Sequence, residues 1–273
     1  MPERTIIGYA ADVPIELTEF ERGEPFDGDA DAAIASLQQR LACAQLSQIV
    51  HRKRAIILLE GWTGANKKSV LKRLVGALDP THVQVVSVGR FDEFNDERHW
   101  LAPFWGSLPS AGDTTIFYRS WYRKLIEQRV LAGLDKKRWL RACDEINEFE
   151  SQQKDHGTLV AKLFFHVTVE RQAANLQQRQ EDPWMRHLRT NEPLISLSQR
   201  NMALEILHEF FAQTDTRWAP WNIVDANDPT ASCISALTML AEMLEKAMPV
   251  EPPAMGETVV QFRQPKTPEQ TRA

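Results

Sequence analysis

The sequence predicts an α/β fold built on a doubly wound parallel sheet, with helices on both sides of the sheet. Two observations support this prediction. Short, nearly all-apolar runs alternate along the chain with longer stretches in which apolar residues recur at helical spacing. The apolar runs also lack the polar–apolar alternation of a half-buried strand, which is typical of strands buried on both faces. Ligands of such sheets bind at the carboxyl ends of the strands, so the residues after each run are the candidates for a site.

The first predicted elements are a helix, a strand and a second helix. Apolar residues at helical spacing predict a helix over residues 29–50. The run AIILLE at 55–60 predicts the first buried strand. A turn at 61–67 then leads into a helix that the breaker Asp79-Pro80 ends.

Four further strands and their helices complete the pattern. The strands are expected at 83–89, 114–118, 159–169 and 221–227. The helices are expected from the third strand to Val130, at 135–155, from the fourth strand to about Gln180, and at 196–213 and 230–248. The aromatic cluster of Trp100, Phe104 and Trp105 either packs on the core or on a partner subunit, or stacks against a base.

Charge divides the chain into an acidic arm and a mildly basic body. Residues 1–31 carry nine acidic residues and two arginines, a net charge of −7, within a chain whose net charge is −5. We therefore expect an acidic arm over residues 1–28, a folded domain over 29–248 and a disordered, proline-rich tail over 249–273. The arm is either simply solvated or the acidic counterpart of a basic cleft that binds a polyanion.

Composition excludes several classes of protein. The 273 residues are 43% hydrophobic and 25% charged, which is typical of a globular chain. No apolar run approaches the roughly 18 residues of a membrane span, and the acidic balance argues against a nucleic-acid coat. Cys43, Cys143 and Cys233 are too scattered for a metal knuckle, and we expect a cytoplasmic location with no secretory signal. The seven histidines show no metal-binding spacing.

The turn after the first strand carries most of a phosphate-binding pattern. A phosphate loop reads G-x-x-x-x-G-K-[ST] between a strand and a helix, and here Gly61 and Lys67 match it. Asn66 replaces the second glycine, but asparagine tolerates left-handed backbone geometry. Lys68 stands at the hydroxyl position and Ser69 follows one residue late. Both lysines would add positive charge at a helix N-terminus, which itself favours anions.

Five segments, in order and with appropriate spacing, resemble the polyphosphate kinase 2 family, whose members transfer phosphoryl groups between inorganic polyphosphate and nucleotides. They are EGWTGANKK, LPSAGDTTIFYRSWY (108–122), EFES (148–151), RQEDP (179–183) and TDTRWAPWNIVDAND (214–228). The resemblance runs from about Arg54 to Met248 and marks the chain as a divergent member with degenerate Walker motifs. A different P-loop kinase, specific for a small acceptor, is the weaker hypothesis, because the TDTRWAPW segment argues against it.

The resemblance implies a P-loop kinase-like three-layer α/β/α fold with a helical lid at about 179–200. Lys67 and Arg119 would be catalytic, with Arg119 clamping a phosphate oxygen. Lys124 takes the place of a family arginine and would also bind phosphate. Three lid arginines would close over the phosphates unless they form a solvated helix face: Arg179, Arg186 and Arg189. The family often forms dimers or larger assemblies, so a homo-oligomer is expected.

Two departures from the family pattern put catalysis in doubt. The resemblance implies aspartates that hold Mg²⁺ or Mn²⁺ where this chain has Thr63 and Tyr118. Phosphoryl transfer depends on neutralising and aligning charge, so losing both carboxylates should impair it. Asp92, Glu93 and Asp96 follow the second strand and could substitute. Some family members carry two fused copies, and this chain is similar to a degenerate copy in its missing acids.

Two hypotheses about function therefore stay open. The first is a phosphotransferase that moves phosphoryl groups between polyphosphate and a nucleotide, with impaired activity. The second is a catalytically inactive pseudoenzyme that binds polyphosphate or nucleotide, or that scaffolds an active paralogue. The replaced acids at Thr63 and Tyr118 motivate the second hypothesis, and the P-loop-like turn with Lys67 and Arg119 motivates the first.

Overall fold

The computed structural model describes residues 14–87, 99–188, 195 and 197–252. Within them, five strands form one sheet in the order β2-β3-β1-β4-β5, and every neighbouring pair is parallel. The strands are β1 (Arg54–Gly61), β2 (Val83–Ser87), β3 (Thr114–Tyr118), β4 (Thr158–His166) and β5 (Trp221–Asp225). The α/β prediction with a parallel sheet is confirmed, and each predicted strand is present.

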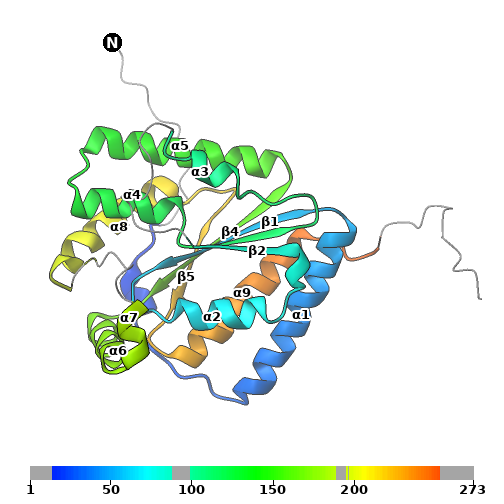
Figure 1. Cartoon of the computed structure of the whole chain (residues 1–273), viewed down its shortest axis with the longest axis horizontal. Coiled ribbons are helices and arrows are strands. Elements are labelled where there is room, and N and C mark those ends of the chain that lie inside the picture. Colours follow the sequence, from blue (N-terminus) through cyan, green and yellow to red (C-terminus); the bar gives the residue numbers. More distant parts are fainter. Residues whose placement is uncertain (1–13, 88–98, 189–194, 196, 253–273) are drawn as a thin grey trace, which may run out of the picture.

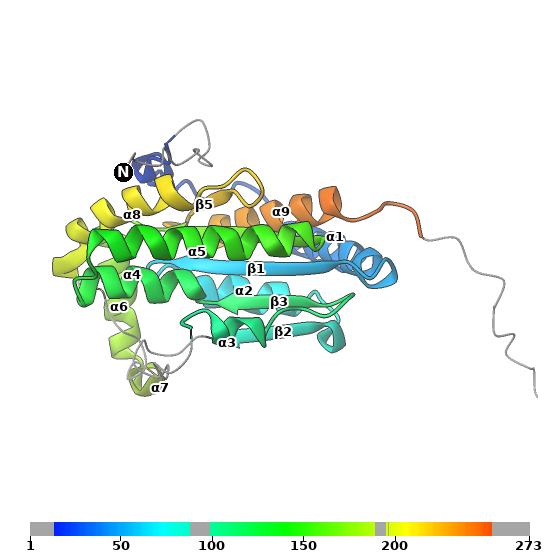
Figure 2. The ribbon, with the colours of Figure 1, turned by 90° about the horizontal axis from the view of Figure 1, so that it is seen from above.

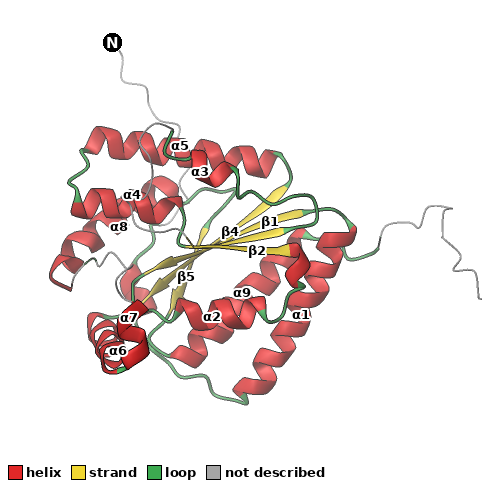
Figure 3. Cartoon of the chain, viewed as in Figure 1, coloured by secondary structure: helices red, strands yellow, loops and turns green. Residues whose placement is uncertain are grey.

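Helices cover both faces of the sheet, as Figures 1 and 3 show. One layer contains α1 (Ala30–Val50), α2 (Lys67–Val75) and α9 (Pro229–Ala247). The opposite layer contains α3 (Ala102–Trp105), α4 (Trp121–Leu131), α5 (Lys136–Asp155) and α8 (Arg200–Thr214). Two more helices, α6 (Val169–Glu181) and α7 (Pro183–Leu188), stand together at one end of the molecule in Figure 2. Helix α7 and the last residues of α6 fall within the stretch predicted as the lid, about 179–200.

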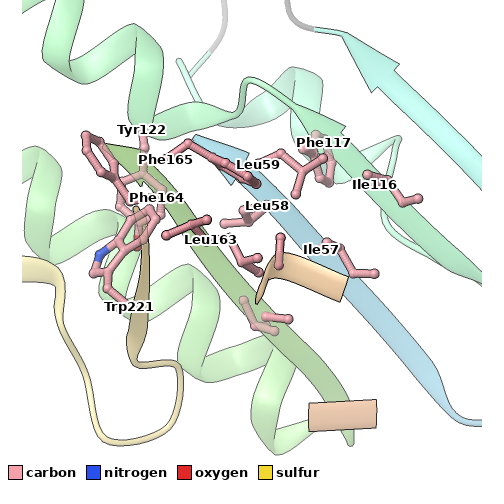
Figure 4. Packing of buried hydrophobic residues seen from close by; sticks show 14 of the residues in the cluster. Ile57, Leu58, Leu59, Ile116, Phe117, Tyr122, Leu163, Phe164, Phe165 and Trp221 are labelled. Carbon is pink, nitrogen blue, oxygen red and sulfur yellow. The ribbon is translucent and has the colours of Figure 1, made fainter. Parts of the chain in front are cut away.

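The central strand β1 positions the loop that follows it. Residues Ala55 to Leu59 are fully buried, because β3 and β4 flank the strand and helices cover both of its faces. Removing a side chain such as Leu59 from this core would cost about 2–5 kcal/mol. Figure 4 shows Leu58 and Leu59 beside Phe117, Leu163 and Phe165. The rigid strand therefore delivers its carboxyl end to a fixed place.

The edge strand β2 differs from the expectation of burial on both faces. Its residues Gln84, Val85 and Ser87 are exposed, and only β3 pairs with it. In the aromatic cluster after β2, Phe104 is buried, whereas Trp105 is half exposed and Trp100 is partly buried. Phe104 makes edge-to-face contacts with Trp121, and Trp105 does the same with Phe149.

The described part of the acidic arm, residues 14–28, lies against the domain and is called the N-terminal segment below. Leu17–Phe20 form a short 3₁₀ helix, and Ile15, Leu17 and Phe20 pack on the hydrophobic core. The backbone N–H of Gly23 donates to Asp225 Oδ2 at 2.8 Å. None of the helices in the described part of the chain is long and apolar enough to cross a lipid bilayer.

Candidate phosphate-binding site

The candidate site lies where β1 and β3 end. The strand register places Leu59 opposite Tyr118, so the loop 61–67 after β1 and the turn at Arg119 after β3 emerge side by side. We call residues 61–67 the β1–α2 loop. Parallel strands place their carboxyl ends at one edge, which is where ligands of such sheets bind.

The β1–α2 loop has the backbone that a phosphate loop needs. Gly61 (φ 120°) and Gly64 (φ 94°) take positive φ values, and Asn66 adopts the left-handed conformation at φ 53°. The left-handed geometry expected at Asn66 is thus present. A Cβ at Gly61 would come within 2.3 Å of the Phe165 carbonyl oxygen, so only glycine fits there.

Lys67 begins helix α2 and points back into its own loop. Its Nζ donates to the carbonyl oxygens of Gly61 and Trp62, at 2.7 Å in each case, and its side chain is buried. The ammonium therefore lies inside the loop, at the N-terminus of a helix. This combination of a cation and a helix N-terminus favours an anion.

A small, strongly cationic pocket opens in front of the loop. It encloses about 220 Å³ including its open mouth, and four of its lining residues are cations from three parts of the chain. Its lining residues are Thr63, Gly64, Ala65, Asn66, Lys67, Tyr118, Arg119, Arg123 and Arg179. Among the residues that the structure describes, no carboxylate lines this cationic pocket, so its net charge suits a polyanion.

Helix α6 closes the side of the cationic pocket. Gln172 Nε2 donates to the Thr63 carbonyl oxygen at 3.0 Å, and Asn175 Nδ2 donates to the Gly64 carbonyl oxygen at 2.8 Å. Arg179, which lines the pocket, follows at helical spacing from these two residues, on the same helix face. Helix α6, whose last residues reach the start of the predicted lid at 179, is therefore docked on the loop.

A second pocket adjoins the first and has a different character. It encloses about 530 Å³, and it shares Thr63 and Arg123 with the cationic pocket. Its apolar lining residues are Trp62, Ile126, Phe164, Ile195, Ala203 and Leu207. Glu60, Glu127 and Gln172 add polar groups to it. An apolar cavity beside an anion pocket can hold a ligand with one uncharged and one phosphorylated part.

The two carboxylates that line the second pocket, Glu60 and Glu127, each bind a neighbouring side chain of the protein. Glu60 Oε1 accepts from the backbone N–H of Ser120 at 2.5 Å and from its hydroxyl at 2.7 Å. Glu127 pairs with Arg123 at 2.6 Å between Oε1 and Nε. Burial raises the pKa of both carboxyl groups, against the opposing effect of Ser120 on Glu60 and of Arg123 on Glu127.

The described residues do not fit a divalent metal ion. Residues 14–87, 99–188, 195 and 197–252 contain no group of three or more His, Cys, Asp or Glu side chains that could hold one. Thr63 and Tyr118, which replace the expected aspartates, both line the cationic pocket. The candidate substitutes Asp92, Glu93 and Asp96 lie outside the described residues. Mg²⁺ binds carboxylate oxygens, which the lining of the cationic pocket lacks.

The structure brings together part of the predicted site. Asn66, Lys67, Arg119 and Arg179 line the cationic pocket, whereas Gly61 lines the adjoining one. Three predicted phosphate ligands are outside the lining of both pockets: Lys68 and Ser69, which are exposed on α2, and Lys124, which is buried on α4. The side chain of Arg186 and all of Arg189 lie outside the described residues.

Arg123 is the main site residue that the sequence did not reveal. It lines both pockets and pairs with Glu127. One signal could have found it: Arg119, Arg123 and Glu127 stand four residues apart, so a helix begun after Arg119 places the last two on one face. The roles of Gln172 and Asn175 depend on contacts more than 100 residues apart in sequence and carry no local signal.

Comparison with known proteins decides the family. The family model described as "Polyphosphate kinase 2 (PPK2)" matches residues 27–252 of this chain. The chain belongs to the polyphosphate kinase 2 family. This confirms the resemblance carried by the five sequence segments, and the three-layer arrangement is the fold of that family.

Two relatives and one solved structure of the polyphosphate kinase 2 family show how similar this chain is to known proteins. It is 29% identical to the polyphosphate:AMP phosphotransferase of Acinetobacter johnsonii, over 86% of this chain and 49% of the relative. It is 29% identical to the GDP-polyphosphate phosphotransferase of Mycolicibacterium smegmatis, over 80% of this chain and 79% of the relative. The polyphosphate kinase 2 structure from Arthrobacter aurescens superimposes with a TM-score of 0.74 at 22% identity, covering 91% of this chain and 92% of that one. This chain thus spans about half the length of the first of these relatives.

Several residues that carry the family resemblance build the core and lie outside the cationic pocket. Lys162 is fully buried and pairs with Glu150 at 3.0 Å. Its Nζ also donates to the Tyr122 hydroxyl at 3.1 Å and to the Thr214 carbonyl oxygen at 2.8 Å. Trp121 Nε1 donates to the other oxygen of Glu150. These four contacts join α4, α5, β4 and α8.

Proposed function

We propose that the cationic pocket binds inorganic polyphosphate and the phosphates of a nucleotide, and that the chain transfers phosphoryl groups between them at an impaired rate. One observation carries the proposal. Lys67, Arg119, Arg123 and Arg179 surround one small pocket at the mouth of a loop whose backbone has the phosphate-loop form. Guanidinium groups suit phosphate oxygens because their N–H donors are planar and fixed.

The division of the site into two pockets supports a nucleotide as one of the substrates. We place the nucleoside part in the second pocket, because its lining is largely apolar, and the phosphates in the cationic pocket. Arg123 lines both pockets and is therefore placed to contact the phosphate nearest the nucleoside. The relatives named above act with AMP or GDP, and that choice for this chain belongs to the same proposal.

Impairment follows from the residues at positions 63 and 118. Phosphoryl transfer needs the negative charges of attacking and leaving groups to be neutralised and aligned. Mg²⁺ or Mn²⁺, when bound, would supply part of that neutralisation. In this chain the pocket offers a threonine and a tyrosine where carboxylates would hold the ion, so its own cations carry the task. Loss of one such stabilising group typically lowers kcat by a factor of about 100 to 1,000.

A turnover assay tests this proposal directly. Purified protein is incubated with polyphosphate, Mg²⁺ or Mn²⁺ and each nucleoside mono- or diphosphate, and product nucleotide is measured against Lys67→Ala. We expect slow turnover in the wild type and none above background in Lys67→Ala. Absence of any difference between the two proteins would overturn phosphoryl transfer. A Lys68→Ala variant is the matched control, because Lys68 is exposed and lines neither pocket.

The second candidate function is a pseudoenzyme that binds polyphosphate or nucleotide, or scaffolds an active paralogue, without transfer. The presence of Thr63 and Tyr118 in the pocket lining favours it. Calorimetry would then give polyphosphate binding that weakens with salt but needs no metal ion, together with no turnover. Measurable Lys67-dependent turnover would eliminate this candidate. Self-association and a cytoplasmic location belong to both candidates, and size-exclusion chromatography tests the first of these two properties.

A further inference from the structure

The indole of Trp62 lines the second pocket and is absent from the lining of the cationic pocket. It is buried, and its Nε1 donates to His166 Nδ1 at 2.9 Å. The guanidinium carbon of Arg200 lies 4.2 Å from the centre of the indole ring. The Trp62 side chain is therefore held by contacts from the end of β4 and from the start of α8.

The hydrogen bond of Trp62 fixes the protonation of His166. An indole N–H can only donate, so His166 Nδ1 must be the acceptor and the ring proton must sit on Nε2. Nε2 lies 2.9 Å from Glu21 Oε1, to which it donates. The result is a directed chain of hydrogen bonds from Trp62 through a neutral His166 to Glu21.

Glu21 belongs to the N-terminal segment, which the sequence places in an acidic arm. The segment is held at the same edge of the sheet by the Gly23 N–H, which donates to Asp225 Oδ2, and by the packing of Phe20 on the core. The carboxylate of Glu21 is itself about one-third exposed. The Glu21 carboxylate therefore connects the solvent-exposed surface to the fully buried His166 ring.

We propose that Glu21 and His166 are positioning residues for the β1–α2 loop. Through the Trp62 indole they hold the backbone of Trp62, whose carbonyl oxygen, with that of Gly61, binds the Lys67 ammonium. The N-terminal segment thereby helps to fix the position of the Lys67 ammonium, although Glu21 does not line the cationic pocket. This inference rests on the proposed binding of polyphosphate. It assigns a positioning role to the acidic arm, whose charge by itself is equally consistent with simple solvation.

Variants of Glu21 separate positioning from mere packing. Glu21→Ala removes the acceptor of the His166 proton and should weaken polyphosphate binding, measured by calorimetry, by about 3- to 10-fold, the effect of one lost hydrogen bond. Glu21→Gln keeps a side-chain oxygen that accepts from Nε2 and should restore most of the affinity. Glu24→Ala, at an exposed residue of the same segment, is the matched control and should bind like the wild type.

NMR of the histidine ring nitrogens and of the tryptophan indole N–H groups supplies a readout that is independent of phosphate. In the wild type, His166 should be the neutral Nε2–H tautomer, and the Trp62 indole signal should shift in Glu21→Ala but not in Glu24→Ala. An Nδ1–H tautomer, or equal polyphosphate affinity of Glu21→Ala and wild type, overturns the inference. If the wild type binds no polyphosphate, the proposed function fails, while the tautomer and the indole shift still decide whether Glu21 positions Trp62.

Discussion

Asn175 of helix α6 donates a 2.8 Å hydrogen bond from Nδ2 to the carbonyl oxygen of Gly64, in the middle of the β1–α2 loop. One turn earlier on the same face, Gln172 donates to the Thr63 carbonyl oxygen. The loop thus accepts hydrogen bonds from helix α6 at two of its carbonyl oxygens. Because Arg179 follows on that face, the docking of α6 also sets where this guanidinium lies.

Removing the Asn175 amide should therefore loosen Arg179 as well as the loop. For Asn175→Ala we expect polyphosphate affinity to fall by about 2- to 10-fold, since one hydrogen bond contributes about 0.5–1.5 kcal/mol. The measurement is a calorimetric titration at fixed salt. Gln178→Ala, at an exposed position of α6, is the control and should leave the affinity unchanged. Equal affinities for the two variants would show that helix α6 does not set the shape of the cationic pocket.

Gly61 should be irreplaceable for a steric reason. A Cβ there would lie 2.3 Å from the Phe165 carbonyl oxygen, on a backbone with φ at 120°, so Gly61→Ala should cost about 3 kcal/mol or more of unfolding free energy. Gly106→Ala is the control, because no atom lies within 4 Å of a Cβ built there and its φ is −69°. Urea unfolding measures both, and similar midpoints for the two variants would contradict the steric argument.

The sequence predicted the parts of this molecule that depend on local pattern. The run AIILLE predicts a strand buried on both faces because no polar residue interrupts it before Glu60. Asn66 was expected to be left-handed because the position of a phosphate-loop glycine demands it, and φ is 53°. Lys68 and Ser69 lie outside the lining of both pockets because each step along α2 turns the side chain by about 100°, away from the direction of Lys67.

The parts that sequence could not predict depend on distant contacts. Glu21 lies 145 residues from His166, and nine acids in its neighbourhood favour a solvated arm. The few apolar residues that anchor the segment, such as Leu17 and Phe20, are too sparse to give a periodic signal. Likewise, the sequence alone gives no reason for Lys162 within an apolar strand, because its partner Glu150 lies on a different element, α5.

The buried pair of Lys162 and Glu150 makes a prediction about stability. Burial lowers the pKa of Lys162, while the Glu150 carboxylate opposes this shift. Lys162→Met should lower the free energy of unfolding by about 3–5 kcal/mol, because it leaves the Glu150 charge buried without its partner. The double variant Lys162→Met/Glu150→Leu should recover most of this loss, since it removes both charges. A double variant as unstable as the sum of the single ones would show that the pair is not the unit of stability. Chemical denaturation measures all of them.

His166 should make the stability of the protein depend on pH. Burial lowers its pKa from the usual 6.5, with Arg200 acting in the same direction and Glu21 and Asp225 opposing both. The unfolded chain therefore takes up the proton more readily than the folded one, so the stabilisation is complete above pH 6.5 and is lost as pH falls below it. Unfolding midpoints of wild type and His166→Gln should diverge most at neutral pH and converge in acid. Parallel profiles would show that His166 stays uncoupled from folding.

Restoring carboxylates at positions 63 and 118 is the sharpest test of why catalysis should be impaired. Both residues line the cationic pocket, so Thr63→Asp/Tyr118→Asp places two acids among Lys67, Arg119 and Arg123. We expect metal-dependent turnover to rise by a factor of about 100 or more, because charge stabilisation at such a centre is worth two to three decades. Without a metal ion, the same variant should bind polyphosphate more weakly than the wild type, because it has lost net positive charge.

The matched control is Thr63→Asn/Tyr118→Asn, which has nearly the same shape without the negative charge. If only the metal site is missing, this neutral variant should stay as slow as the wild type while the acidic one gains Mg²⁺-dependent turnover. A gain in both variants would point to relief of steric blocking by the Tyr118 ring, which lies 5.3 Å from the Arg119 guanidinium carbon. A gain in neither variant would mean that the remaining pocket cannot align the reacting phosphates, and the pseudoenzyme would then be the better account.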